Sequence, residues 1–495
     1  MLDQTKAPLV EALQTLANRP HAAFYAPGHK QGQGINPLLQ TVLGSKVFRA
    51  DLPELPELDN LFAPEGVIKE AQELAAEAFG AEQTWFLVNG STSGIIAAIL
   101  ATCRTGDQII VPRNVHQSVI SGLILSGAIP IFIQPEYDTH WDLAYSITTD
   151  ALKAALNQHS DVKAVLAVYP TYHGICGEIK QLAAITHQYN IPLLVDEAHG
   201  PHFHFHPDFP IAALTAGADL VVQSIHKVLG AMTQASMLHV QGNKINRNRL
   251  NQALQMVQSS SPNYLLLASL DAARQQMATQ GRFLMEQTLN LAAKARILLD
   301  KIPKISVLEF PKSKQTSFTE LDPTRLTIKI SDLGLTGYQA DEILHQQFKV
   351  TAELPSLKHL TFIISLGNTE ANIEQLVNAF TQLSTMGKSQ PLNREFPLPP
   401  GFLPAMQLSP REAFEAASQR RSVQDCVGCI SAEIICPYPP GIPILMPGEQ
   451  ITLEAITYLQ NILAQGGIIT GCSDPTLETL KICQPQPKSN NYPYS

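Results

Sequence analysis

Residues 193–199 read LLVDEAH, and residues 219–227 read DLVVQSIHK. In each stretch a short apolar run ends in side chains that can do chemistry, among them Asp196 and Lys227. Short, uniformly apolar runs of this kind predict strands buried on both faces, as in a parallel sheet. Ligands bind beyond the carboxyl ends of such strands. The two stretches therefore predict an α/β fold with a site at one edge of its sheet.

The same pattern extends from about residue 82 to residue 240. Helix-like segments, such as 95–102, 150–158 and 179–188, separate the apolar runs. Strands that alternate with helices form a mostly parallel sheet covered on both faces. The expected strands are 84–88, 108–111, 129–133, 164–168, 193–195 and 220–223.

The chain of 495 residues is too long for one compact core and predicts several units. Composition and periodicity change at several points along it, and a Pro-rich stretch reads as a linker. The polar end of the chain, from residue 484, is expected to be disordered. The expected units are an N-terminal segment (1–80), a large domain with a helical connector (81–300), a small α/β domain (301–385), the linker (386–404) and a C-terminal domain (405–495).

Composition excludes several classes of protein. The formal net charge of −9 argues against nucleic-acid binding, which needs clustered Lys and Arg. Two uncharged stretches, 85–103 and 117–134, are broken by the turn sequences NGSTSG and SGAIP, so no membrane span is expected. Seven cysteines in a chain of this length, without a signal-peptide pattern, predict a reducing cytoplasm.

Lys227 and Asp196 suggest chemistry on an aldehyde cofactor. A partly desolvated lysine amine forms an imine with an aldehyde. A carboxylate at the end of a buried strand needs a positive partner, and a pyridinium nitrogen would supply one. That carboxylate would keep the nitrogen protonated and make the ring a better electron sink. Taken alone, the lysine is more typical of a surface residue that follows a strand, and an Asp at the end of a strand commonly caps the next helix.

Two further features follow predicted strands of the same sheet. Residues 89–94, NGSTSG, open an apolar helix, and the free N–H groups and hydroxyls at such a helix start suit a phosphate. His116 follows the strand 108–111, where a flat ring can stack on a cofactor ring. A plain turn and a structural histidine are the ordinary alternatives. Agreement among the four features favours one bound cofactor.

Longer motifs resemble the Orn/Lys/Arg decarboxylase family of fold-type-I pyridoxal-phosphate (PLP) enzymes. The resemblance covers nearly the whole chain and is closest to the short, biosynthetic type. The first and last of the motifs are specific to this family, whereas other fold-type-I enzymes share only the cofactor residues. The motifs are PGHKQG (27–32), DLPELPELDNL (51–61), NGSTSG (89–94), NVHQS (114–118), DEAHG (196–200), SIHK (224–227) and SAEIICPYPPGIPILMPGE (431–449).

This resemblance implies an aminotransferase-like large domain with a mostly parallel seven-stranded sheet, a smaller α/β domain and a C-terminal α+β domain. It implies that Lys227 holds PLP as a Schiff base, that Asp196 faces the pyridine nitrogen and that His116 stacks on the ring. His199 is implied near the imine, and a homodimer or larger homo-oligomer is implied as well. The implied phosphate contacts are Ser91, Thr92, Ser224 and His226.

The implied activity is decarboxylation of a small cationic amino acid to its amine for polyamine metabolism, with arginine slightly favoured over lysine or ornithine. A fold-type-I aminotransferase or aldolase and a non-catalytic PLP-binding amine sensor stay open as alternatives. The distal cation of the substrate needs a carboxylate. The candidates for that carboxylate are Asp51, Glu54, Glu57, Asp59 and Glu433.

Two clusters of potential metal ligands carry a weaker hypothesis. The histidines at 199, 202, 204 and 206 suggest a metal hydrolase, and Cys426 with Cys429, near Cys436, suggests a redox switch or half a zinc site. Neither spacing fixes a tetrahedral set of ligands. We therefore expect no metal and interpret the thiols as buried and free.

Overall fold

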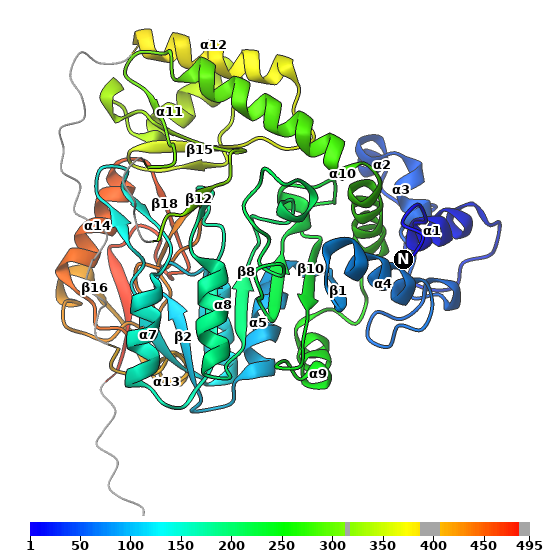
Figure 1. Cartoon of the computed structure of the whole chain (residues 1–495), viewed down its shortest axis with the longest axis horizontal. Helices are drawn as coiled ribbons and strands as arrows, with labels where there is room; N and C mark the ends of the chain where they lie inside the picture. The colour runs from blue at the N-terminus through cyan, green and yellow to red at the C-terminus, as the bar shows by residue number, and fades with distance from the viewer. Residues whose placement is uncertain (312–316, 387–405, 485–495) are drawn as a thin grey trace, which may run out of the picture.

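A seven-stranded sheet lies at the centre of the protein, with helices on both of its faces (Figure 1). This computed structural model describes residues 1–311, 317–386 and 406–484. The predicted linker and polar tail therefore lie almost wholly outside the described residues. The strands of the sheet are β1 (Gln83–Leu87), β2 (Gln108–Pro112), β3 (Ile129–Ile133), β6 (Val162–Val168), β8 (Leu193–Asp196), β9 (Leu220–Gln223) and β10 (Ser236–Val240).

The strand order is β1-β10-β9-β8-β6-β2-β3. Strand β10 is antiparallel to both of its neighbours, and the other four adjacent pairs are parallel. This confirms the predicted seven-stranded, mostly parallel sheet. The sequence pattern misses β10, because only a 3-10 turn (Ile225–Lys227) and no α-helix separates it from β9, so the strand–helix alternation is interrupted there.

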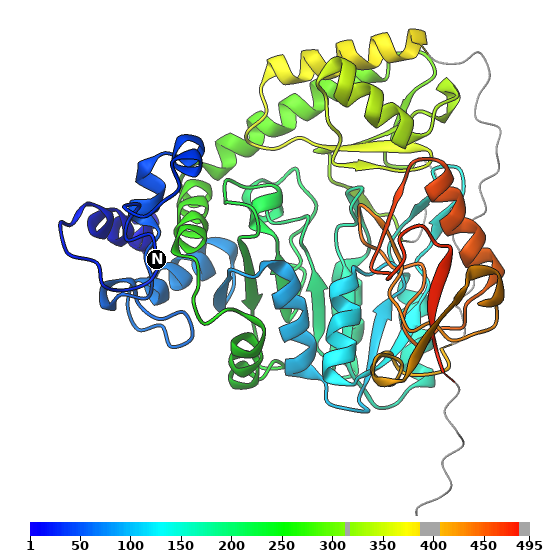
Figure 2. The same cartoon turned by 180° about the vertical axis from the view of Figure 1, so that it is seen from behind.

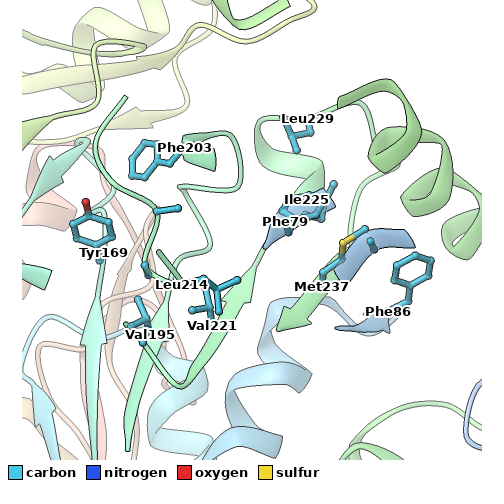
Figure 3. Packing of buried hydrophobic residues seen from close by; sticks show 14 of the residues in the cluster. Phe79, Phe86, Tyr169, Val195, Phe203, Leu214, Val221, Ile225, Leu229 and Met237 are labelled. Carbon is cyan, nitrogen blue, oxygen red and sulfur yellow. The ribbon is translucent and has the colours of Figure 1, made fainter. Parts of the chain in front are cut away.

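The strands read as uninterrupted apolar runs because both faces of the sheet are buried. Alternate residues point to opposite faces. Val195 and Val221 pack with Phe79 in one apolar cluster (Figure 3), whereas Leu194 and Val222 belong to a second cluster on the other face. The first face is covered by α4 (Val67–Phe79), α7 (Thr149–Gln158) and α8 (Ile179–Gln188), and the second by α5 (Gly90–Thr102), α6 (Gln117–Ser126) and α9 (Arg247–Val257).

The two uncharged stretches of the sequence each divide into a strand and a helix. Residues 85–103 contain the end of β1 and all of α5, and residues 117–134 contain α6 and β3. In the described parts of the chain, no helix combines the length and the apolar character that crossing a bilayer requires.

A smaller antiparallel sheet is joined to the large one by a 36-residue helix, α10 (Tyr264–Leu299), as both views show (Figures 1 and 2). The last turns of α10 contribute Ala295 and Leu299 to the core of the smaller sheet. Helices α11 (Gly337–Ile343) and α12 (Glu370–Met386) complete that core. The strands, in spatial order, are β11 (Ser306–Val307), β13 (Arg325–Lys329), β15 (His359–Ile363) and β14 (Leu354–Pro355).

The C-terminal unit has its own apolar cluster and packs against α6. There Arg411 donates from Nε to the backbone oxygen of Ile124, at 2.7 Å. The domain boundaries drawn from the sequence stay a prediction. The elements of the unit are α13 (Pro410–Glu415), β16 (Ser418–Ser422), β17 (Cys436–Tyr438), α14 (Leu453–Ala464), β18 (Ile468–Thr470) and β19 (Thr479–Cys483).

A buried ion pair on α10 anchors the N-terminal residues of the chain. Arg274 and Asp271 are fully buried, one turn apart on α10, and are paired with each other. Arg274 also donates to the backbone oxygens of Gln4 and Lys6, and Asp271 accepts from the backbone of Leu9. The helices before α4 are α1 (Pro8–Asn18), α2 (Pro37–Leu43) and α3 (Ser45–Ala50).

We expect Arg274→Ala to lower the free energy of unfolding by about 3 kcal/mol or more, because it leaves Asp271 buried without its counter-charge. The N-terminal residues should also become sensitive to limited proteolysis. Arg282→Ala, at an exposed position of the same helix, is the control and should change neither. Wild-type resistance to protease in Arg274→Ala would contradict this anchoring role.

Candidate active site

Side chains that follow four strands of the central sheet meet in one pocket. Asp196 ends β8, and Lys227 ends the short turn after β9. His116 caps α6 after β2, and Ser91 lies in the first turn of α5 after β1. These four residues and His199 line what we call the Lys227 pocket. Its other lining residues are Asn114, Val168, Pro170, Tyr172 and Ala198.

Lys227 and Asp196 are both removed from water in this pocket. Burial has the largest effect on the pKa of Lys227 and lowers it, although the Asp196 carboxylate raises it in part. Burial likewise raises the pKa of Asp196, and the Lys227 charge opposes that change. An amine with a lowered pKa is neutral more of the time and is therefore a better nucleophile for an aldehyde carbon.

His199 connects Lys227 to the smaller sheet. Its Nε2 lies 2.9 Å from Lys227 Nζ. On the other side of the ring, Arg325 Nη2 donates to the His199 backbone oxygen at 2.9 Å and lies 3.3 Å from Nδ1. A guanidinium only donates, so when Nδ1 accepts from Arg325 the ring proton is on Nε2, and the Lys227 amine can accept that proton only in its neutral form. Burial and the charge of Lys227 hold the pKa of His199 well below its usual range, which keeps the ring neutral.

Arg325 comes from β13 of the smaller sheet and is fully buried. Asp322 Oδ2 lies 3.8 Å from Arg325 Nε and 3.1 Å from His202 Nε2. Within the described residues, Arg325 Nη1 has no hydrogen-bond partner. The buried Arg325 guanidinium, which keeps one free donor, adds positive charge near Lys227. Its bond to His199 also connects the pocket to the smaller sheet.

A loop of the C-terminal unit closes the side of the pocket at His116. The Gln117 N–H donates to the backbone oxygen of Gly441 at 3.2 Å, and the Tyr172 hydroxyl donates to that of Pro440 at 3.1 Å. A Cβ atom on Gly441 would stand 3.5 Å from the His116 ring. Gly441 has φ +83°, which favours glycine at this turn. The loop therefore packs on the histidine that was predicted to stack on a cofactor.

The other predicted cofactor residues lie around the pocket with different exposures. Ser224 is buried and donates from its hydroxyl to that of Ser91, at 2.8 Å. Thr92 is exposed at the start of α5. The backbone N–H of His226 donates to Ala235, and burial lowers the pKa of its ring to about 4. Thr92 and His226 are not among the described residues that line the pocket.

None of the five predicted substrate carboxylates lines the Lys227 pocket in the described chain. Asp59 accepts the backbone N–H groups of Gly66 and Ile68 at the start of α4, and Glu433 accepts those of Ser473 and Lys481. These two carboxylates therefore stabilise backbone turns. The remaining partners are His29 for Asp51, Asn60 for Glu54 and Arg19 for Glu57.

The histidine and cysteine clusters do not form ligand sets in the described residues. His202 pairs with Asp322, and His206 Nε2 lies 2.8 Å from Glu286. The ring of His204 lies beside Gly80. Cys426 and Cys429 are free thiols, as are the other five cysteines.

Sequence reasoning misses three residues of this site. Tyr172 and Asn114 both follow strands, and a search of every strand end for polar residues would have found them. The Tyr172 ring lies 4.4 Å from that of His199 and 5.4 Å from Lys227 Nζ. Arg325 is 126 residues from His199 in the chain, and no local sequence pattern predicts that contact.

Comparison with known proteins decides the family. The family profile described as the major domain of Orn/Lys/Arg decarboxylase matches residues 7–372. The chain belongs to the Orn/Lys/Arg decarboxylase family. The profile of the family's C-terminal domain matches residues 395–468. The arginine decarboxylase of Bacillus subtilis (strain 168) is 38% identical over 98% of this chain and 99% of its own. The family predicted from the sequence motifs is confirmed.

Solved structures confirm the fold class. The lysine decarboxylase LdcF of Francisella novicida superposes with a TM-score of 0.84, at 23% identity, over 97% of this chain and 81% of its own. An alanine–glyoxylate aminotransferase from Nostoc sp. superposes with a TM-score of 0.52, at 17% identity, over 66% of this chain and 88% of its own. The large domain thus has the aminotransferase-like fold expected of this decarboxylase family.

The residues of the Lys227 pocket fit PLP. Lys227 is desolvated opposite a buried carboxylate, as a covalent link to an aldehyde and a contact to a pyridine nitrogen require. Ser91 and Ser224 supply hydroxyls at the start of α5, where a helix N-terminus suits a phosphate. The neutral His116 ring, whose pKa burial lowers to about 4, supplies a flat surface.

The Tyr172 hydroxyl is expected to hold the C-terminal loop over the pocket. Tyr172→Phe keeps the ring beside His199 but loses the bond to Pro440, so backbone amides within 437–444 should exchange hydrogen faster. Tyr169→Phe is a matched control, because the Tyr169 hydroxyl donates to Ile211 instead. Hydrogen exchange read by mass spectrometry tests this. Equal exchange of the loop in both variants would show that the bond does not restrain it.

Titration of Lys227 tests the electrostatics of the pocket. In the apoprotein its pKa should lie below 10.5, because burial disfavours the ammonium form. Asp196→Asn should lower that pKa further, because the carboxylate favours the charged amine. Competitive acetylation over a pH series, read by mass spectrometry, gives the midpoint. Lys180, exposed on α8, should label alike in both proteins. A Lys227 midpoint that Asp196→Asn leaves unchanged refutes the coupling.

Proposed function

We propose that this chain is a PLP-dependent carboxy-lyase that converts a basic amino acid to its amine. The observation that carries the proposal is the desolvated Lys227 facing a buried Asp196, in a chain of the Orn/Lys/Arg decarboxylase family. PLP, when bound, supplies the electron sink that accepts the electrons left as carbon dioxide departs.

Each residue of the pocket has a distinct task in this proposal. Lys227 would hold the cofactor covalently through its side-chain amine. Asp196 would keep the pyridine nitrogen protonated, and His116, on which the C-terminal loop packs, would offer its ring for stacking. The phosphate is assigned to Ser91, Thr92, Ser224 and His226.

Proton transfer in this proposal uses the Lys227 amine and the His199 imidazole. When the Lys227 amine is neutral, His199 Nε2 carries its proton 2.9 Å from Lys227 Nζ, because Arg325 donates toward Nδ1. A proton held between these two nitrogens lies where the substrate carbon must be reprotonated. The C-terminal loop restricts water at the pocket, which strengthens the fixed charges.

Arginine is the preferred substrate of the proposal, with lysine or ornithine as the alternatives. A relative named arginine decarboxylase is 38% identical over nearly the full length of both chains, whereas the lysine decarboxylase with the similar structure is 23% identical. An aminotransferase or aldolase is disfavoured by the match to the family's C-terminal decarboxylase domain over residues 395–468.

A homodimer is part of the proposal, because one chain alone leaves apolar surface exposed. Leu38 and Val42 of α2 are each 78% exposed. Burial of this helix against a second chain would also place the carboxylates of residues 51–59 near another subunit. Seven free thiols support the reducing cytoplasm expected from the sequence.

The test supplies arginine, lysine and ornithine together to the PLP-loaded protein and identifies the products. We expect carbon dioxide with agmatine as the main amine. Lys227→Ala should lower the rate roughly a thousandfold or more, because it removes the covalent link. Lys180→Ala should leave the rate unchanged. A keto acid in place of carbon dioxide would indicate an aminotransferase, and equally slow release by wild type and Lys227→Ala would indicate a non-catalytic protein.

A further inference from the structure

A second, larger cavity adjoins the Lys227 pocket. It has a volume of about 480 Å³, within the range of small-molecule sites. The two cavities share Asn114, Val168 and Tyr172 in their walls, so they lie side by side. The second lies between the hairpin of β4 (Tyr137–Asp138) and β5 (Leu143–Ala144), the smaller sheet and the C-terminal unit. We call it the tyrosine cavity, after Tyr137, Tyr172, Tyr338 and Tyr458 in its wall.

The carboxylate of Asp142 stands among three of these phenols. The hydroxyl of Tyr137 donates to Asp142 Oδ1. Burial, and after it the charge of Asp142, raise the pKa of Tyr338 to about 12. The same two causes raise the pKa of Tyr458. The negative charge of Asp142 is therefore close to all three hydroxyls, and aromatic rings line the cavity around it.

The basic groups of the cavity wall do not neutralise Asp142. Arg113 is committed to Glu449, at 3.1 Å, and to two backbone oxygens of the C-terminal loop. His173 is uncharged, because burial lowers its pKa to about 4. His359 is uncharged as well, because burial holds its pKa well below the usual range. Lys358, outside the wall, donates to the backbone oxygen of Thr139. No lysine or arginine of the described residues forms a salt bridge with Asp142.

We propose that the tyrosine cavity binds an alkyl cation, an ammonium or guanidinium on an aliphatic chain, with Asp142 as its counter-charge. The tyrosine rings offer their negative faces to the cation, and the prolines of the 437–443 loop offer apolar contact to the chain. The cation is either the basic end of the amino acid, extended from the Lys227 pocket, or a free amine. In the first case the proposal rests on the proposed function.

With Asp142 as the counter-charge, the cation is recognised by the same subunit that carries Lys227. The five carboxylates predicted from the sequence lie outside both cavities of the described chain. Asp142 belongs to the same chain as Lys227 and lines the cavity next to its pocket. Recognition of the cation then needs no residue from a second copy.

Asp142→Asn tests the proposal with little structural change. Residue 142 has φ +58°, a conformation that asparagine tolerates, and an amide oxygen still accepts from Tyr137. Agmatine and cadaverine are titrated calorimetrically into the full-length, PLP-loaded protein and into its Lys227→Ala variant. We expect Asp142→Asn to raise their dissociation constants at least tenfold. Asp150→Asn, whose side chain is 94% exposed on α7, is the matched control and should bind as wild type does.

Steady-state kinetics distinguish the two sources of the cation. Amines that compete with the amino acid, together with a raised KM and an unchanged kcat in Asp142→Asn, identify the basic end of the substrate. Inhibition that does not compete, and that Asp142→Asn removes, identifies a free amine. Both outcomes support the cavity as a cation site. Wild-type amine affinity in Asp142→Asn overturns it.

A second variant keeps the proposal testable if Asp142→Asn does not fold. Tyr458→Phe removes one hydroxyl beside the carboxylate and retains the ring, so amine binding should weaken severalfold. Wild-type affinity in this variant also counts against the site. Amine binding that depends on Asp142 without carbon dioxide release would refute the proposed function alone, and carbon dioxide release with unaltered amine binding would refute the cavity alone.

Discussion

The structure depends on holding an amine and a carboxylate out of water at one edge of the central sheet. Strands β8 and β9 are adjacent and parallel, with Asp196 in register with Val222. The end of β8 and the turn that carries Lys227 therefore emerge side by side. Burial pushes the pKa of the lysine down and that of the carboxylic acid up, and each charge restrains the other's shift. The free energy of this arrangement comes from two apolar layers that bury both faces of the sheet.

Three parts of the chain converge on that pair of residues. The large sheet supplies the lysine and the carboxylate, the smaller sheet supplies Arg325, and the C-terminal unit supplies the loop that packs on His116. Arg325 donates to the backbone oxygen of His199, and the ring of His199 lies 2.9 Å from Lys227, so the smaller sheet acts on Lys227 through one imidazole. Movement of either outer unit would therefore change the proton positions at the lysine.

The central sheet was predictable because its signal is local. Apolar runs and the helices between them follow from burial on both faces, and Ser91, His116, Asp196, His199 and Lys227 all stand just after strands. Long-range contacts were not predictable in this way. Strand β10 follows β9 with no α-helix between them, and Arg325 contacts His199 from another sheet. Asp142 acquires Tyr338 and Tyr458 as neighbours only when the smaller domain and the C-terminal unit pack beside its hairpin. The five candidate substrate carboxylates have the charge that a cation needs, but charge does not reveal their partners, and those of Asp59 and Glu433 are backbone N–H groups.

The central claim is that the side chain at position 227 bonds to an aldehyde cofactor whose ring faces residue 196. Borohydride reduction of the PLP-loaded protein, followed by peptide mapping, tests it most directly. The account predicts a stable pyridoxyl group on the peptide that contains Lys227 and on no other lysine. Reduction that leaves this peptide unmodified, or that places the group on another lysine, would contradict it.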